Sequence, residues 1–229
     1  MKKVAILQSN YIPWKGYFDM IKMVDEFILY DDMQYTKRDW RNRNKIKTPN
    51  GLQWLTVPVE VKGKYFQKIN ETLVSEGNWA KDHWNTIKGF YGKAKYFKEY
   101  KEPFEAFYLT TQEKYLSRIN FELINIVNEI LGIKTKISWS SDYTIVDGKT
   151  ERLLNLVQQA NGTEYISGPA AKDYIVEDLF KEAGIQLSWM DYSGYNEYEQ
   201  LYPPFEHGVT VLDLIFNEGE NAKQFMKSL

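Results

Sequence analysis

Short apolar runs alternate with segments of helical periodicity along this chain. Residues 4–7 form a compact apolar run of the kind that a buried strand shows. Phe18, Ile21 and Val24 then recur at helical spacing, and residues 27–30 form a second apolar run. A strand, a short helix and another strand within 30 residues predict a βαβ unit with parallel strands.

The middle of the chain has a different pattern. Residues 48–51 predict a turn, and residues 55–61 read as a strand in which Pro58 favours an edge position. Residues 79–131 are helical in pattern, and Gly132 stands where a helix C-cap is expected. The apolar stripe on this segment contains Tyr115, Ile119, Leu123, Ile126, Val127 and Ile130.

The second half returns to alternating strands and helices. Strands are expected around residues 137–139, 165–166 and 185–190, and helices over 150–160, 169–183 and 209–216. We therefore predict a single α/β domain over residues 1–229. Its Rossmann-like sheet is mostly parallel, and residues 79–131 form a central helical insertion.

Composition narrows the classes of function. The 229 residues include no cysteine and only two histidines, which excludes disulfides, thiolate metal sites and a histidine-rich metal site. The formal net charge of −2 argues against a general nucleic-acid coat. The first apolar run is too short for a signal peptide, and no run approaches a membrane span, so we expect a soluble, cytoplasmic protein.

The loop after the first strand carries polar and aromatic groups where open α/β sheets bind ligands. A helix that begins near Gly16 would present backbone N–H groups and a partial positive charge to an anion. An ordinary tight βα turn is the alternative. The candidate substrate-binding residues here are Gln8, Asn10, Trp14, Lys15, Gly16 and Tyr17.

Residues 37–47 hold six basic residues against one acid, directly after the second strand. Arginine forks bind phosphate or carboxylate in two-point fashion, although such a run is also typical of a solvated face. The bulk of an indole beside these charges suits the face of a base or sugar. The candidates in this run are Arg38, Trp40, Arg41 and Arg43.

Asp31 and Asp32 end the second strand and are the candidate catalytic residues. Paired carboxylates could accept a proton, bind ribose or amino groups, or hold Mg²⁺. The alternative is that they only cap the strand end beside the basic run. The sequence does not identify a cofactor, and it leaves open whether these carboxylates hold Mg²⁺.

Ser167 and Gly168 form a second turn after a short strand, followed by Pro169 and an expected helix. The two turns would then direct two helix N-termini into one crevice, with Tyr192 supplying another aromatic face. A serine nucleophile needs a nearby base, and the chain offers His83, which we expect to be packed or on the surface, and His207. A Ser-His-Asp hydrolase is therefore not favoured.

Several motifs together resemble the WbqC-like family of bacterial proteins across nearly the whole chain. They are QSNYIPWKGYFD, LYDDMQYTKRDWRNRNKIKT, GLQWLTVPV, YISGPAAKDYI and TVLDLIFNEG. The resemblance implies a role in O-antigen or other surface-polysaccharide biosynthesis. The suspected activity of the family is transfer of an amino acid, glycine in particular, to an amino sugar. His207 falls in a turn where the family pattern is more neutral.

The opening also looks like that of the nucleotidyltransferase and class I synthetase (HUP) superfamily. Its signature is His-x-Gly-His at the helix start, whereas this chain has Trp14-Lys15-Gly16-Tyr17. Both catalytic histidines are absent, so the likeness implies kinship of fold, leaves nucleotide binding open and does not carry over histidine-assisted adenylyl transfer.

These observations lead to an expected enzyme that forms an amide on the amine of a nucleotide-linked amino sugar. The basic residues would hold the diphosphate, and Asp31 or Asp32 would accept the amine proton. The acyl donor is open among an aminoacyl-tRNA, a thioester and an adenylate. The alternatives are a non-catalytic nucleotide-sugar or glycan-binding module and a single-stranded nucleic-acid binder, which the acidic balance disfavours.

Overall fold

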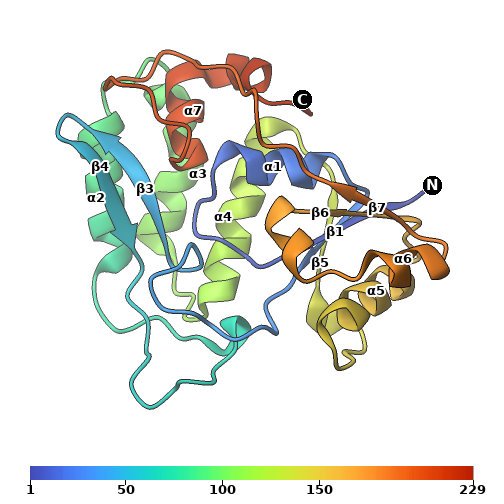
Figure 1. Ribbon diagram of the computed structural model, residues 1–229. Helices are drawn as coiled ribbons and strands as arrows, with labels where there is room; N and C mark the ends of the chain where they lie inside the picture. The colour runs from blue at the N-terminus through green and yellow to red at the C-terminus, as the bar shows by residue number, and fades with distance from the viewer. Residues whose placement is uncertain (229) are drawn as a thin grey trace.

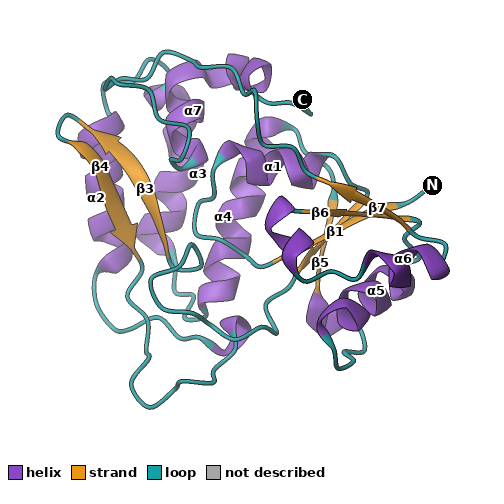
Figure 2. Cartoon of the chain, in the orientation of Figure 1, coloured by secondary structure: helices purple, strands orange, loops and turns teal. Residues whose placement is uncertain are grey.

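A parallel five-stranded sheet organises the protein, whose computed structural model describes residues 1–228 (Figures 1 and 2). The strand order is β5-β2-β1-β6-β7, and each neighbouring pair is parallel. Counted along the chain within this sheet, the order is 3-2-1-4-5, the Rossmann order without its sixth strand. The strands are β1 (Lys3–Leu7), β2 (Glu26–Leu29), β5 (Lys136–Trp139), β6 (Glu164–Ser167) and β7 (Gln186–Trp189).

Helices cover both faces of the sheet. Side chains of β1 alternate between two cores: Ala5 packs in the core that contains α1 and α4, whereas Val4 and Ile6 pack in the core that contains α5 and α6. Burial on both faces explains why parallel strands appear in the sequence as continuous apolar runs. The helices outside the insertion are α1 (Lys15–Lys22), α5 (Lys149–Gln159), α6 (Glu177–Glu182) and α7 (Val211–Glu218).

The helical insertion over residues 79–131 is confirmed. It comprises α2 (Trp79–Tyr91), α3 (Phe97–Thr110) and α4 (Leu116–Leu131), between the hairpin of β3 and β4 and strand β5. Gly132 ends α4 in the left-handed conformation, with φ of 69°, as its sequence position predicted. Short 3₁₀ segments complete the secondary structure: η1 (Ile69–Glu71), η2 (Ser140–Asp142), η3 (Pro169–Asp173) and η4 (Gly219–Phe225). No helix within the described residues has both the length and the apolar character that crossing a membrane requires.

The predicted strand at residues 55–61 is wrong in its extent. The turn at residues 48–51 joins β3 (Arg43–Thr48) to β4 (Gly51–Thr56) in an antiparallel hairpin, and Val59 forms only an isolated bridge. Half of the basic run is therefore a strand. Its inward positions include Asn44 besides Ile46, so the apolar alternation that marks a strand was missing from the sequence.

The predicted helix over residues 169–183 is also wrong, because it is broken in the middle. Pro169 begins the 3₁₀ segment η3, and α6 starts only at Glu177. Val176 is extended, and Ile175 turns into the core between the two segments. The turn at Ser167 and Gly168 therefore does not lead into a regular α-helix, and the expectation of two similar α-helix N-termini fails at the second turn.

Candidate functional site

The carboxyl ends of β1 and β6 mark the place where an open α/β sheet of this order binds ligands. β1 pairs in parallel with β2 on one side and with β6 on the other. The strand order therefore reverses at β1, because β2 and β5 lie on one side of it and β6 and β7 lie on the other. Gln8 follows β1, and Ser167 and Gly168 stand at the end of β6. The structure thus brings these three predicted residues to the same edge of the sheet, although none of them lines the pocket described next.

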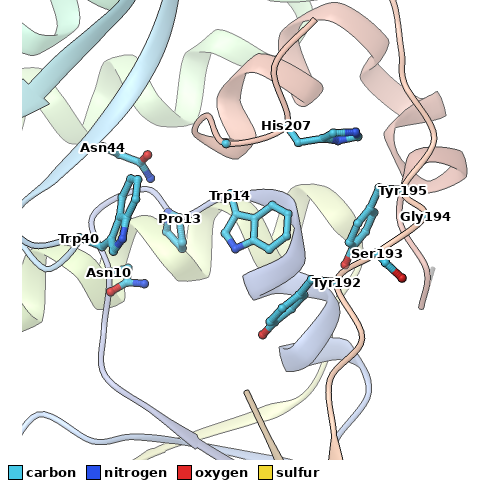
Figure 3. A pocket seen from close by; sticks show the side chains of 11 residues that line it. Asn10, Pro13, Trp14, Trp40, Asn44, Tyr192, Ser193, Gly194, Tyr195 and His207 are labelled. Carbon is cyan, nitrogen blue, oxygen red and sulfur yellow. The ribbon is translucent and has the colours of Figure 1, made fainter. Parts of the chain in front are cut away.

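A pocket of about 600 Å³ opens beside this edge (Figure 3). In Figure 3, the indole of Trp14 lies between Tyr192 and Tyr195 on one side and Asn10 and Trp40 on the other. Four segments that are far apart in the sequence form the lining: Asn10, Pro13 and Trp14; Trp40 and Asn44; Tyr192, Ser193, Gly194 and Tyr195; His207 and Gly208. Four of the predicted binding residues meet here, namely Asn10, Trp14, Trp40 and Tyr192.

Aromatic edges and faces define the wall around Trp14. Its ring centroid lies 5.2 Å from that of Tyr192 and 5.6 Å from that of Tyr195, both in edge-on arrangements. Gly16 makes this position possible, because a Cβ there would lie 2.4 Å from the Trp14 ring. Tyr17 is buried below, and its hydroxyl donates to the Gln8 carbonyl at 3.1 Å, which ties helix α1 to the end of β1.

Gly16→Ala is expected to push Trp14 out of the pocket wall. The added methyl meets a ring packed against two tyrosines, and overpacking of this kind costs about 1–3 kcal/mol of stability. Gly89→Ala is the matched control, because Gly89 lies within helix α2 with open space around its Cβ position, so a gain of about 0.5–1 kcal/mol is expected. Thermal melting and tryptophan emission measure both effects. Unchanged emission in Gly16→Ala would contradict the close packing.

Lys15 supports the pocket wall from behind. Its ammonium is buried, donates to the Asn196 carbonyl at 3.1 Å and lies 4.9 Å from the Tyr195 ring centroid and 5.2 Å from that of Tyr198. Burial lowers the pKa of Lys15 to about 8, although the charges of two buried aspartates oppose this shift. Lys15, which the sequence predicted to bind phosphate, therefore does not line the pocket and acts on it through its contacts with residues 195–198.

His207 contributes an imidazole to the pocket rim. Its Nδ1 atom is buried without a hydrogen-bond partner in the described residues, and the Phe205 ring packs against it edge-on at 4.6 Å. Burial lowers the pKa of His207, and the positive charge of Lys15 lowers it further. The imidazole is therefore neutral at pH 7 and able to accept a proton from a group in the pocket.

The structure divides the three predicted arginines between two surfaces. The Arg41 side chain is 12% exposed and donates to Asn10 Oδ1, while its Nε has no partner in the described residues. Burial lowers the pKa of Arg41. Arg43 instead donates to the carbonyl of Arg38 and stacks on Trp54, away from the lining. Of the three, only Arg41 reaches a residue of the pocket.

Asp31 is a buried anchor for the loop that follows β1. One carboxyl oxygen accepts the Ser9 backbone N–H at 2.8 Å, and the other accepts the Ser117 hydroxyl of helix α4. Burial raises the pKa of Asp31, against the effect of these hydrogen bonds. Ser9 also accepts from Asn120 at 3.0 Å, so α4 holds the base of the loop at two points. The position of Asp31 favours positioning of the loop, and its catalytic role stays a prediction.

Asp32 faces a different set of partners. It accepts from the Ser140 hydroxyl at 2.5 Å and from the Asn70 amide at 3.2 Å, and it lies 3.8 Å from the Lys68 ammonium. Asp31 and Asp32 therefore hold separate groups. Among residues 1–228, no group of three or more histidine, aspartate or glutamate side chains is arranged to hold a metal.

Sequence reasoning missed several residues that build this site. Tyr195 lines the pocket, and its hydroxyl donates to Asp19 at 2.6 Å. Asp19, fully buried in α1, also accepts the backbone N–H groups of Lys227 and Ser228, so it joins the pocket wall to the end of the described chain. A lone acid within the apolar pattern of a short helix was the signal that could have pointed to Asp19.

Comparison with known proteins places this arrangement in a family. The model of the WbqC-like protein family matches residues 8–225, which include all of the pocket residues. The chain is 55% identical over 227 residues to "Uncharacterized protein Rv1507c" of Mycobacterium tuberculosis (strain ATCC 25618 / H37Rv), covering 99% of this chain and 98% of the relative. No solved structure matches. The resemblance of the motifs is thus confirmed: this α/β chain belongs to the WbqC-like protein family.

Proposed function

We propose that the pocket binds a nucleotide-linked amino sugar and that the protein transfers an aminoacyl group, such as glycine, to the sugar amine. The product would serve the biosynthesis of a surface polysaccharide such as O-antigen, in the cytoplasm. The observation that carries this proposal is a neutral imidazole, His207, on the rim of an aromatic pocket at the ligand-binding edge of the sheet.

The chemistry needs a base at this position. The amine attacks an acyl carbonyl, a C–N bond forms, the bond from the carbonyl carbon to the leaving group breaks, and the nitrogen loses a proton. His207 is uncharged at neutral pH and its imidazole lines the pocket, so it can take that proton and return it to the leaving group. Asp31 and Asp32 hold neighbouring segments and do not line the pocket.

The lining suits the two halves of such a substrate. Trp14 and Tyr192 offer flat apolar faces to a base or a sugar ring. Arg41 holds the lining residue Asn10 in place, and its guanidinium lies 3.7 Å from the carboxylate of Asp39. A non-catalytic module for nucleotide sugars or glycans would use the same binding groups and show no turnover.

A thermal-shift titration tests the proposal. The ligands are dTDP- and UDP-linked amino sugars, the matching hydroxyl sugars and the free nucleotides, each with and without Mg²⁺. At about 100 times Kd a ligand stabilises the folded protein by about 2.7 kcal/mol, and Trp14→Ala should abolish the shift. A shift with hydroxyl and amino sugars alike would support the binding module, and no shift with any nucleotide would overturn the proposed substrate.

A further inference from the structure

One face of the β3–β4 hairpin carries cations and indoles outside the pocket. Lys45 pairs with Trp54 across the hairpin, and Arg43 pairs with Thr56, so these four side chains share one face. The opposite face turns Ile46 into the core. Figure 1 shows the hairpin at the side of the molecule away from the parallel sheet, where its outer face is not covered by a helix.

The groups on this face form a connected cluster with exposed rings. Trp54 is 39% exposed and Trp40 is 40% exposed, and their ring centroids lie 5.3 Å apart. The Arg43 guanidinium stacks 4.1 Å from the Trp54 centroid, and the Lys45 ammonium lies 5.2 Å from it. We refer to Trp40, Arg43, Lys45 and Trp54 as the hairpin patch.

The charges of the hairpin patch are not neutralised by the chain. Within the residues that the structure describes, neither Arg43 nor Lys45 forms an ion pair with a carboxylate. Residues 43–56 contain no aspartate or glutamate at all. The whole protein has a net charge of −2, so this uncompensated positive charge is a local property of the hairpin patch. It complements an anionic partner.

Trp40 connects the hairpin patch to the pocket. Its ring lies against Trp54 and within 5.7 Å of the Lys45 ammonium, and the same side chain lines the pocket with Asn10 and Trp14. A flexible chain that stacks on the hairpin patch can therefore continue past Trp40 to the pocket, where Figure 3 shows His207 on the rim.

We propose that the hairpin patch binds the single-stranded 3′ end of an aminoacylated RNA, and that this RNA is the acyl donor of the reaction at the pocket; this inference rests on the proposed function. Exposed aromatic rings interleaved with cations are the elements with which proteins hold single-stranded nucleic acids, because bases stack on the rings and phosphates pair with the cations. Neutral glycans would need no cations, whereas the phosphates of a single strand do.

The reaction that this donor supports is balanced without a further reactant. The amine of the acceptor attacks the ester carbonyl at the terminal ribose, a C–N bond forms and the C–O bond to the ribose breaks. His207 takes the proton from the nitrogen and gives it to the departing ribose oxygen, which leaves as a hydroxyl. The products are the amide and an RNA with a free 3′ end.

Fluorescence anisotropy of a 5′-labelled, unacylated single-stranded RNA of 12 nucleotides tests the surface. The variants are Trp54→Ala and the double variant Arg43→Ala/Lys45→Ala, measured between 50 and 200 mM salt. We expect Kd to rise by about tenfold or more in each. In the double variant, the slope of log K against log salt should fall by about 1.4, since a single strand contributes about 0.7 per phosphate contact.

Two control variants remove the same kinds of side chain, an aromatic ring and two positive charges, from surfaces outside the hairpin patch. Phe66→Ala deletes an aromatic ring that is 82% exposed, and Lys93→Ala/Lys98→Ala removes two exposed charges around α3. Both controls should leave RNA binding within about twofold. The same loss of affinity in the charge control, equal binding of duplex RNA, equal binding of a sulfated polysaccharide, or no RNA binding at 50 mM salt would each overturn the inference.

Nucleotide-sugar binding, followed by thermal shift in the same variants, separates this inference from the proposed function. Trp54→Ala should keep that shift while losing RNA, because Trp54 does not line the pocket. Trp40→Ala should weaken both ligands, since Trp40 belongs to both surfaces. RNA binding that depends on the patch, in a protein that binds no nucleotide sugar, would overturn the proposed acceptor and leave the RNA surface standing.

Discussion

His207→Gln is expected to lower turnover by about 10²–10⁴-fold while the affinity for the nucleotide sugar stays within about threefold. Glutamine keeps a polar side chain of similar reach at the pocket rim, but it cannot accept a proton. The result would separate a base from a binding group, because loss of a binding group would reduce affinity and turnover together. Single-turnover rates with a saturating acceptor, together with calorimetric Kd values, measure the two effects.

The pH dependence of kcat/KM, compared between the wild type and His207→Gln, provides a second test of the base. Because burial and Lys15 lower the pKa of His207, the wild-type kcat/KM should rise with pH and level off below the ordinary histidine pKa of about 6.5. His207→Gln should lose that inflection and keep any inflection that belongs to the acceptor amine. An unchanged profile in the variant would assign the base to another group, and a loss of affinity equal to the loss of rate would make His207 a binding residue.

The sequence specified the five-stranded sheet more fully than it specified the β3–β4 hairpin. Strands β1 and β2 are buried on both faces, and their continuous apolar runs stand out from polar flanks. Strand β3 alternates basic residues with Asn44 and Ile46, so its pattern reads as a charged loop. Pairing with β4 and packing against the rest of the fold make it a strand, and neither effect is visible in a local window.

The sequence predicted which loops gather at the site, but it did not predict the directions in which their long side chains point. Loops at the carboxyl ends of parallel strands must gather at one edge, and this rule placed Asn10, Trp14 and Tyr192 near one another. The direction of a long side chain depends on tertiary contacts. Lys15 turns into an aromatic cage, and Arg43 turns onto Trp54, because rings from other segments lie within reach.

Tyr192, Ser193, Gly194 and Tyr195 form one wall of the pocket and belong to a segment without regular secondary structure. Residues 190–210 contain no helix or strand, so no periodicity predicts where they run. Hydrogen bonds fix their path: Tyr195 donates to Asp19 at 2.6 Å, and Tyr198 donates to the buried Asp213 at 2.8 Å. Such contacts join residues that are far apart in the chain, which explains why the sequence alone did not place Tyr195 and His207 in the pocket.

Asp31→Ala is expected to lower the free energy of unfolding by about 3 kcal/mol and to disorder the loop after β1, which carries the pocket residues Asn10 and Trp14. The substitution leaves the Ser9 N–H and the Ser117 hydroxyl buried without an acceptor, and each such group costs about 1–3 kcal/mol. Asp25→Ala is the control, because Asp25 is exposed and accepts one N–H, that of Lys3, so a loss below about 1 kcal/mol is expected. Chemical denaturation measures both.

Asp31→Asn separates the charge of this anchor from its shape. Its amide accepts one of the two donors and directs an NH₂ group at the other, so stability should fall between that of the wild type and that of the alanine variant.

The raised pKa of Asp31 in the folded protein means that the folded protein binds this proton more tightly than the unfolded chain does. Stability from this group is therefore present at low pH and is lost as pH rises through the folded pKa. The wild type should gain on Asp31→Asn as the pH falls toward 4, and an opposite trend would show that the carboxylate is stabilised where it lies.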